Sequence, residues 1–308
     1  MTEHQEQPRT LRFHSEWSRI VPEGTSVRKI ADGFQFTEGP IWDREQAKLY
    51  FSDIPANRIY SWDSRDGLQL FREPSGNSNG LTLDRSGRLL ACEHGNRRVS
   101  ITDDDGRIRT LVESFGGKRL NSPNDIVVKS DGMIYFTDPP YGLSDPSEQE
   151  QPCQGVYRLN PDSSELELLY EGLHRPNGLA FSPDESILYV NDSSTQDLFA
   201  FDVTAEGTLS HYRLFARMDS TVGAGGPDGM KVDTEGNVYA TGPGGIWVYN
   251  PAGEALGVLL VPEPAANLGW GGADRRTLYI TANTSVYAAD LSIPGISVMR
   301  SKDREGTV

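Results

Sequence analysis

The sequence predicts an all-β fold, a six-bladed β-propeller built from four-stranded antiparallel blades. The main observation is a unit that occurs six times, in which a polar residue opens a short apolar run, followed by a turn and a second apolar run. The opening residues, which we call anchors, lie 41, 45, 53, 51 and 39 positions apart. This spacing is typical of propellers and other repeat folds. The anchors are Glu38, Asn79, Asn124, Asn177, Asp228 and Asn267.

Each unit has a constant internal spacing and enough strands for one blade. The anchor precedes a Tyr or Leu of the second run by 11 or 12 positions in every unit. A third run follows, as in residues 59–63, and five units add a fourth, as in residues 109–112. Four strands in about 40–50 residues are typical of a propeller blade.

The sixth unit lacks a clear fourth strand, and residues 26–30 are strand-like just before the first anchor. We expect this N-terminal strand to complete the last blade and close the ring, which removes an open sheet edge. Residues 1–25 are predicted to form an N-terminal arm packed outside the ring, residues 26–300 one propeller domain, and residues 301–308 a tail.

Composition restricts the partners and the compartment. The formal net charge of −15 argues against nucleic acid and anionic membranes as partners, and mainly indicates solubility. No run approaches the length of a membrane span, and residues 1–10 lack the basic start and apolar core of a signal peptide. Cys92 and Cys153 fall in different blades, so we expect a cytoplasmic protein with reduced thiols. The sequence leaves open whether it is a monomer or a homodimer.

The anchors offer a set of oxygen ligands. First strands line the central tunnel of a propeller, so six anchors in one register should converge at one level. One Glu, one Asp and four Asn provide carboxylate and amide oxygens, which suit a hard cation. Two carboxylates with several amides fit Ca²⁺ better than Mg²⁺, and the lack of Cys or His disfavours Zn²⁺ or Cu as the native ion. We therefore predict one divalent cation, Ca²⁺, for which Mg²⁺, Mn²⁺ or Zn²⁺ could substitute.

A structural role for some anchors stays open. Asn and Asp before Gly are turn formers and could simply cap the loops between blades. We favour that interpretation for Asn79 and Asn267, and leave open whether they touch metal or substrate. Glu38 is not a turn former, and a carboxylate inside a tunnel needs a partner, which favours the metal site.

Five short motifs, in order and at blade spacing, resemble the gluconolactonase, regucalcin and luciferin-regenerating enzyme family, and most closely its bacterial gluconolactonases. The resemblance covers nearly all of residues 30–290 and implies a six-bladed propeller with one catalytic divalent ion, usually Ca²⁺. It implies Glu38, Asn177 and Asp228 as ligands, with Asn124 as a fourth ligand or a substrate contact. The motifs are Glu38-Gly-Pro, Asn121-Ser-Pro-Asn-Asp125, Thr137-Asp-Pro-Pro-Tyr-Gly142, Arg175-Pro-Asn-Gly178 and Pro227-Asp-Gly-Met230.

The resemblance implies hydrolysis of a sugar-acid lactone, such as gluconolactone, to the aldonic acid. A metal would polarise the carbonyl, and we expect Asp228 both to touch the metal and to act as general base, with Glu38 purely a ligand. The sequence has no Gly-x-Ser-x-Gly motif and no Cys with a plausible His partner, which counts against a covalent nucleophile.

Substrate contacts are predicted less directly. The regucalcins carry an Arg two residues before the Asn that matches Asn124, where this chain has Ser122. Arg119, three residues further back, is a candidate replacement. His94 follows a second strand, and Tyr141 could form a wall for a sugar ring, although packing roles also fit both. The candidate substrate contacts are Asn124, Asn79, Arg119, His94 and Tyr141.

Two other functions stay open. The same metal site could hydrolyse phosphotriesters or fluorophosphates, since a related propeller family uses a similar set of Glu, Asn and Asp residues. The protein could also be a non-catalytic propeller that binds Ca²⁺ structurally. The first predicts a larger kcat/KM for a neutral organophosphate than for an aldonolactone, and the second predicts metal binding without turnover.

Overall fold

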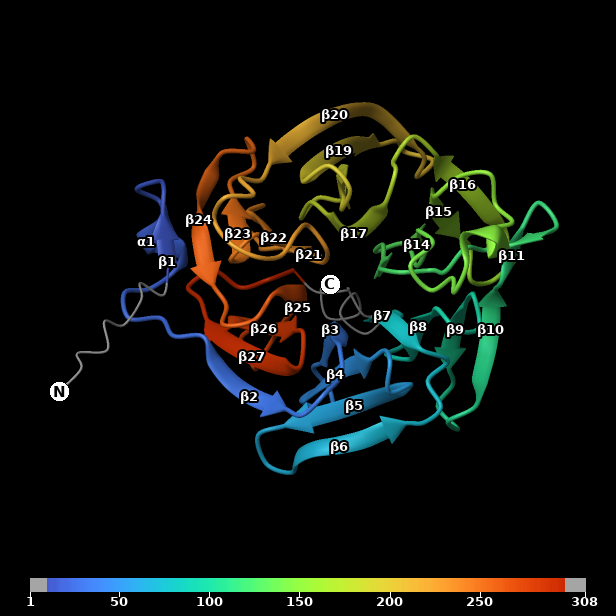
Figure 1. Ribbon diagram of the computed structural model, residues 1–308, viewed down its shortest axis with the longest axis horizontal. Helices are drawn as coiled ribbons and strands as arrows, with labels where there is room; N and C mark the ends of the chain where they lie inside the picture. Colours follow the sequence, from blue (N-terminus) through green and yellow to red (C-terminus); the bar gives the residue numbers. More distant parts are fainter. Residues whose placement is uncertain (1–9, 297–308) are drawn as a thin grey trace, which may run out of the picture.

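The computed structural model describes residues 10–296 and confirms the predicted six-bladed propeller. Six antiparallel sheets are arranged around a common axis, with the first strand of each blade innermost and the fourth at the rim (Figure 1). Residues 1–9 of the predicted arm, residues 297–300 and the predicted tail 301–308 lie outside the described residues.

The first three blades follow one another along the chain. Blade one contains β3 (Thr37–Asp43), β4 (Lys48–Asp53), β5 (Arg58–Asp63) and β6 (Gly67–Arg72). Blade two contains β7 (Ser78–Leu83), β8 (Leu89–Glu93), β9 (Arg98–Thr102) and β10 (Ile108–Val112). Blade three contains β13 (Ile126–Val128), β14 (Ile134–Asp138), β15 (Gly155–Leu159) and β16 (Leu166–Tyr170). The short hairpin of β11 (Ser114–Phe115) and β12 (Lys118–Arg119) connects blade two to blade three. The 3₁₀ turn η1 (Pro146–Glu148) is inserted in blade three.

The other three blades complete the ring. Blade four contains β17 (Pro176–Phe181), β18 (Ile187–Asp192), β19 (Asp197–Val203) and β20 (Leu209–Arg217). Blade five contains β21 (Met230–Val232), β22 (Val238–Gly242), β23 (Gly245–Tyr249) and β24 (Ala255–Leu260). Blade six contains β25 (Ala265–Gly271), β26 (Thr277–Ala282) and β27 (Ser285–Asp290), and β2 (Arg28–Asp32) is its fourth strand.

The ring is closed by the N-terminal strand, as the sequence predicts. β2 pairs antiparallel with β27, so segments from opposite ends of the chain share one sheet. The strand begins two residues later than the strand-like stretch 26–30 indicates, and the pairing shifts register between Lys29 and Ala31.

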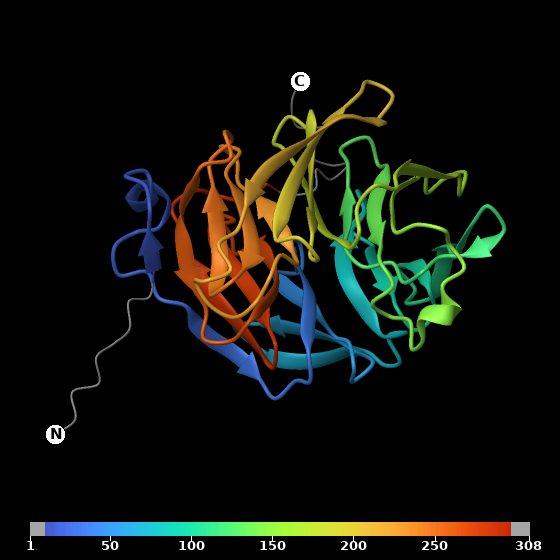
Figure 2. The same cartoon turned by 45° about the horizontal axis from the view of Figure 1, so that its top comes forward.

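The described part of the N-terminal arm packs on the outside of blade five. β1 (Thr10–Arg12) adds a fifth strand beside β24, and α1 (Trp17–Ile20) follows it (Figures 1 and 2). Trp17 and Ile20 are buried in the apolar core between blades five and six.

Aromatic contacts join neighbouring blades. Trp42 of blade one stacks on Tyr279 of blade six at 5.3 Å, and the ring of Tyr135 in blade three meets that of Phe181 in blade four edge-on at 5.0 Å.

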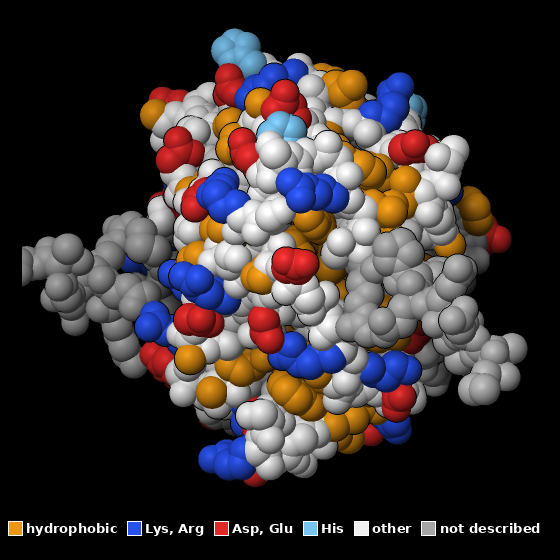
Figure 3. Space-filling model, turned by 90° about the vertical axis from the view of Figure 1, so that its left-hand side faces the viewer, with side chains coloured by type: hydrophobic (Ala, Val, Ile, Leu, Met, Phe, Trp, Pro, Cys, Tyr) orange, Lys and Arg blue, Asp and Glu red, His pale blue; other side chains and the backbone are white. Residues whose placement is uncertain are grey.

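On the side face shown in Figure 3, acidic and basic side chains are interspersed rather than separated by sign. Within residues 10–296 no helix is long and apolar enough to cross a membrane.

Candidate functional site

The anchors lie where the innermost strands begin. Near most of them, the regular ladder of backbone hydrogen bonds to the second strand is interrupted. In blades one, two, four and six the register of the first strand shifts next to the anchor, for instance between Glu38 and Ile41. Such bulges re-aim side chains, and they are common next to functional sites. In blades three and five the regular strand begins only two residues after the anchor. The backbone N–H of Asp228 there donates to the Thr241 hydroxyl at 2.9 Å.

A glycine after an anchor allows adjacent blades to approach closely. Gly80 donates its N–H to the Asn124 carbonyl at 2.8 Å, and Gly178 donates to the Asp228 carbonyl at 2.7 Å. A Cβ atom on Gly80 would lie 2.5 Å from the Asn124 carbonyl oxygen, and one on Gly178 would collide with that of Asp228. The glycine after Asn79 therefore allows close contact between innermost strands.

The carboxyl groups of Glu38 and Asp228 come together at the axis. Glu38 is 1% exposed, and its side chain and that of Asp228 lie within hydrogen-bonding reach of each other. Burial, followed by repulsion from Asp125, raises the pKa of Glu38 from its ordinary 4.5 to about 7. Burial, followed by repulsion from Glu38 and then Asp125, raises the pKa of Asp228 well above its ordinary value. A cation bound between the two carboxyls would strongly favour their ionised forms.

In two anchor amides the nitrogen has a hydrogen-bonding neighbour, whereas the oxygen has none among the described residues. The Asn177 amide nitrogen donates to the Ser193 hydroxyl at 3.1 Å, and that of Asn79 lies 3.2 Å from Nε2 of His94. Within residues 10–296 neither Asn177 Oδ1 nor Asn79 Oδ1 has a hydrogen-bond partner, although both are buried. A buried amide oxygen without a partner is costly, so these atoms fit a site that receives a cation or a donor.

Asn267 supports Glu38 rather than offering a free ligand. Its amide nitrogen donates to Glu38 Oε2 at 2.9 Å, and its own oxygen accepts the N–H of Leu268 at 2.8 Å. Gly39 donates to the same Glu38 oxygen at 2.5 Å. Asn124 is 3% exposed, and its backbone carbonyl accepts the N–H of Gly80 from blade two.

Sequence reasoning missed a charged pair next to the anchors. Asp125 is 2% exposed, and its Oδ2 atom lies 3.8 Å from Nζ of Lys231. Asp125 raises the pKa values of Glu38 and Asp228, whereas Lys231 lowers that of Glu38. Asp125 ends one quoted motif and Lys231 directly follows another, but nothing in those motifs indicates that the two side chains meet.

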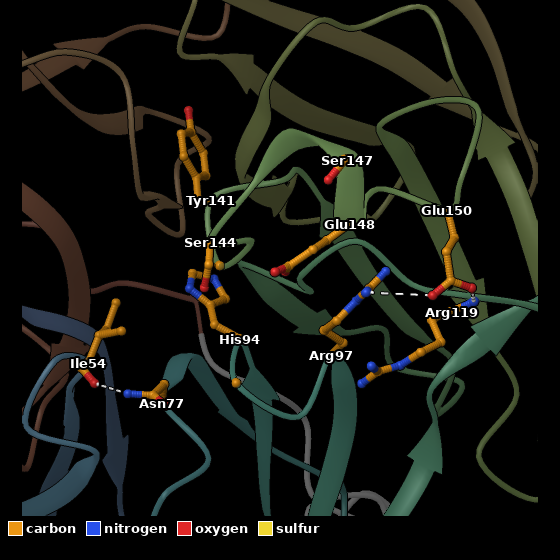
Figure 4. A pocket seen from close by; sticks show the side chains of 12 residues that line it. Ile54, Asn77, His94, Arg97, Arg119, Tyr141, Ser144, Ser147, Glu148 and Glu150 are labelled. Atoms are coloured by element: carbon orange, nitrogen blue, oxygen red, sulfur yellow. Dashed lines mark hydrogen bonds and ion pairs between the residues drawn. The ribbon is translucent and has the colours of Figure 1, made fainter.

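A cavity of about 720 Å³, which we call the head cavity, adjoins the anchors and is lined by His94, Arg119 and Tyr141 (Figure 4). All three were predicted from the sequence as substrate contacts. Burial lowers the pKa of His94 to about 4, so its imidazole is neutral at pH 7 beside Asn79. The Tyr141 hydroxyl neighbours Ser193 and Asn177, which connects this cavity to the anchor groups.

Ser122 has a structural role in this chain. It is fully buried, donates to the Pro139 carbonyl at 2.6 Å and accepts the N–H of Gly142 at 2.8 Å. It therefore fixes the loop that carries Tyr141. Arg119, the proposed replacement for the regucalcin Arg, is exposed on β12 and donates to the Asn96 carbonyl at 3.2 Å.

The anchors near the axis offer carboxyl and amide oxygens, which are donors that a hard cation accepts. The described residues contain no group of three or more His, Cys, Asp or Glu side chains arranged to hold a metal ion. A cation at the axis would therefore use the carboxyls of Glu38 and Asp228 together with amide oxygens, which is the chemistry that Ca²⁺ accepts.

Comparison with known proteins places the chain in a family. Residues 36–284 match the family model described as SMP-30/Gluconolactonase/LRE-like region. The chain belongs to this family.

Several named proteins are similar to the chain along most of their length. The chain is 36% identical over 300 residues to a gluconolactonase of Zymomonas mobilis, covering 89% of this chain and 84% of that protein. It is 27% identical over 264 residues to the pentonolactonase XacC of Haloferax volcanii, covering 83% of this chain and 84% of that one. A solved gluconolactonase from Xanthomonas campestris superposes with a TM-score of 0.86 at 34% identity, over 93% of this chain and 96% of the other.

Proposed function

We propose that this protein hydrolyses the ring ester of a sugar-acid lactone, such as a gluconolactone, to the aldonic acid. The observation that carries the proposal is the close pair of Glu38 and Asp228 carboxyls. This pair lies next to the head cavity and beside buried amide oxygens that have no partner within residues 10–296. The names of the family members cited above support a lactone as the substrate.

We infer that Glu38, Asp228 and Asn177 hold one divalent cation, Ca²⁺, with Asn124 as a further ligand or a substrate contact. Two carboxyls that repel each other and an amide oxygen that lacks a partner within the described residues fit such an ion. When bound, the ion supplies polarisation of the lactone carbonyl and acidification of water.

The protein's own groups then handle the proton. The Asp228 carboxylate takes a proton from the attacking water as the water oxygen bonds to the carbonyl carbon. Cleavage of the bond between that carbon and the ring oxygen follows, and Asp228 returns the proton to the departing alkoxide. Asn267 keeps Glu38 in place through its 2.9 Å hydrogen bond, and Glu38 acts only as a metal ligand.

A substrate panel with controlled metal content tests this function. Metal-free protein should hydrolyse glucono-1,5-lactone only at the background rate, and Ca²⁺ should restore turnover more effectively than Mg²⁺, Mn²⁺ or Zn²⁺. A neutral phosphotriester tested in parallel should give a far smaller kcat/KM. Ca²⁺ binding without turnover of any lactone would contradict the proposal.

A further inference from the structure

The turn between β8 and β9 carries two cavity residues of different chemistry. His94 begins this turn and lies beside Asn79, whereas Arg97 ends it, and both line the head cavity (Figure 4). The Arg97 N–H donates to the His94 carbonyl at 3.2 Å, and Arg97 has a left-handed φ of 55°. A turn of this kind holds its end residues less than about 7 Å apart.

The Arg97 side chain is buried but has hydrogen-bonding capacity to spare. It is only 8% exposed, its Nε donates to the Leu120 carbonyl at 2.7 Å, and its Nη1 lies 3.6 Å from a carboxylate oxygen of Glu150. Its Nη2 is buried and has no hydrogen-bond partner anywhere in the described part of the chain. A guanidinium donor in the cavity wall that lacks an acceptor indicates a ligand oxygen.

The charges around Arg97 indicate what kind of oxygen fits. Arg97 and Arg119 face Glu148 and Glu150 in the same cavity wall, so the formal charges balance. Figure 4 shows the Glu148 side chain extending toward the space between His94 and Arg97. A balanced wall offers little attraction to a phosphate dianion. A hydroxyl group fits well, because it can accept from the guanidinium and donate to a carboxylate.

We propose that Arg97 binds a hydroxyl group at the end of the lactone remote from the reacting carbonyl, and so selects unphosphorylated, polyhydroxylated lactones. This rests on the proposed function, since the reacting carbonyl must lie at the anchors for the remote end to reach Arg97. The assignment differs from the sequence-based choice of Arg119, whose side chain is exposed and already bonded to the Asn96 carbonyl.

The test compares substrates with and without hydroxyl groups. Arg97→Met should lower the ratio of kcat/KM for glucono-1,5-lactone to that for δ-valerolactone by about 10- to 100-fold, the range for one hydrogen bond to a charged donor. Arg97→Lys keeps a positive charge near Glu150 and near the buried Asp138, so the same ratio of kcat/KM values should fall less. The wild-type protein should also prefer glucono-1,5-lactone to its 6-phosphate.

Several results would overturn the proposal. An unchanged ratio in Arg97→Met, with either equal losses on both lactones or no loss on either, would mean that Arg97 makes no selective contact. Preference for the 6-phosphate would mean that the wall binds an anion. If the wild-type protein hydrolyses no lactone, the proposed function fails. Titration with glucitol then tests the contact separately, because it should bind to wild-type protein and at least tenfold more weakly to Arg97→Met; equal binding, or none to either protein, would reject the contact.

Discussion

Two cavities of similar size in the described part of the chain have walls that differ in chemistry. The head cavity has a volume of about 720 Å³ and is lined by charged and polar side chains such as His94 and Glu148. The second, which we call the axial cavity, has a volume of about 770 Å³ and is lined by residues from all six innermost strands. Much of its wall is apolar, including Leu81, Phe181 and Val232.

The two cavities have similar volumes, so volume does not identify the candidate site. Polar groups without hydrogen-bond partners among the described residues do identify it. The carboxyls of Glu38 and Asp228 lie at the strand starts beside the head cavity, as do the amide oxygens of Asn79 and Asn177, which lack a partner among the described residues. The axial cavity contains mostly the inward side chains that any regular first strand must present, together with Lys231. We therefore expect changes near the head cavity to alter chemistry and changes in the axial cavity to alter stability.

The largest expected effect follows from Asp228→Asn. Removing the proton acceptor should lower kcat for glucono-1,5-lactone by about 10³-fold, within the range for loss of a general base. Calorimetric titration should still detect Ca²⁺, more weakly than in the wild type, because Glu38 and Asn177 remain. Unchanged turnover would show that Asp228 is not the base. Glu38→Gln provides the matched control. In this variant the affinity for Ca²⁺ should fall more than the kcat at saturating Ca²⁺.

The pH dependence of metal stabilisation should be large and have a defined sign. The metal-free folded state keeps a proton on Glu38 up to a pKa of about 7, whereas an ordinary Glu loses it near 4.5. Metal-free stability attributable to this group therefore falls as the pH rises from about 4.5 to 7. A cation that binds only the folded state should raise Tm more at pH 8 than at pH 5. Equal Tm increases at both pH values, measured on dialysed protein with saturating Ca²⁺, would contradict the assignment of Glu38.

Asn267→Ala tests the support of Glu38. Loss of the 2.9 Å hydrogen bond should weaken Ca²⁺ binding about 10-fold, as is usual for residues that orient a metal ligand. The hydrolysis rate at saturating Ca²⁺ should fall much less. An unchanged affinity in calorimetric titration would show that Glu38 holds its position without this amide.

Phe181→Leu tests the axial cavity and should have the smallest effect. Phe181 is 5% exposed and contacts the ring of Tyr135, so the shorter side chain should lower the free energy of unfolding by about 1–2 kcal/mol. The kcat/KM for glucono-1,5-lactone should stay within about twofold of the wild type, because changes distant from the reacting groups leave transition-state contacts intact. A large kcat/KM loss at wild-type stability would break the contrast between the two cavities.

The fold could be predicted because each blade repeats the same local pattern. The anchors and the second strands recur at fixed offsets, and the missing fourth strand of blade six has an obvious substitute before the first anchor. The convergence of Glu38 and Asp228 follows from the same register, although the sequence does not show that their carboxyls lie within hydrogen-bonding reach.

The rest of the site depends on contacts between blades that leave no periodic trace. Arg97 lies in a turn between strands, and nothing in the sequence distinguishes its buried guanidinium from the exposed one of Arg119. Ser122 was a departure from the family pattern, and only the structure shows that it fixes the Tyr141 loop. The glycine after Asn79 resembles a turn former locally, but the approach of the next blade is what requires it.

A crystal structure of the protein grown with Mn²⁺ in place of Ca²⁺, and measured for anomalous scattering, tests the central claim most directly. We predict one strong peak at the axis, within coordination distance of Glu38, Asp228 and the free oxygen of Asn177. Absence of a peak there, with the Glu38 and Asp228 carboxyls still within hydrogen-bonding reach of each other, would contradict the cation site on which the proposed hydrolysis depends.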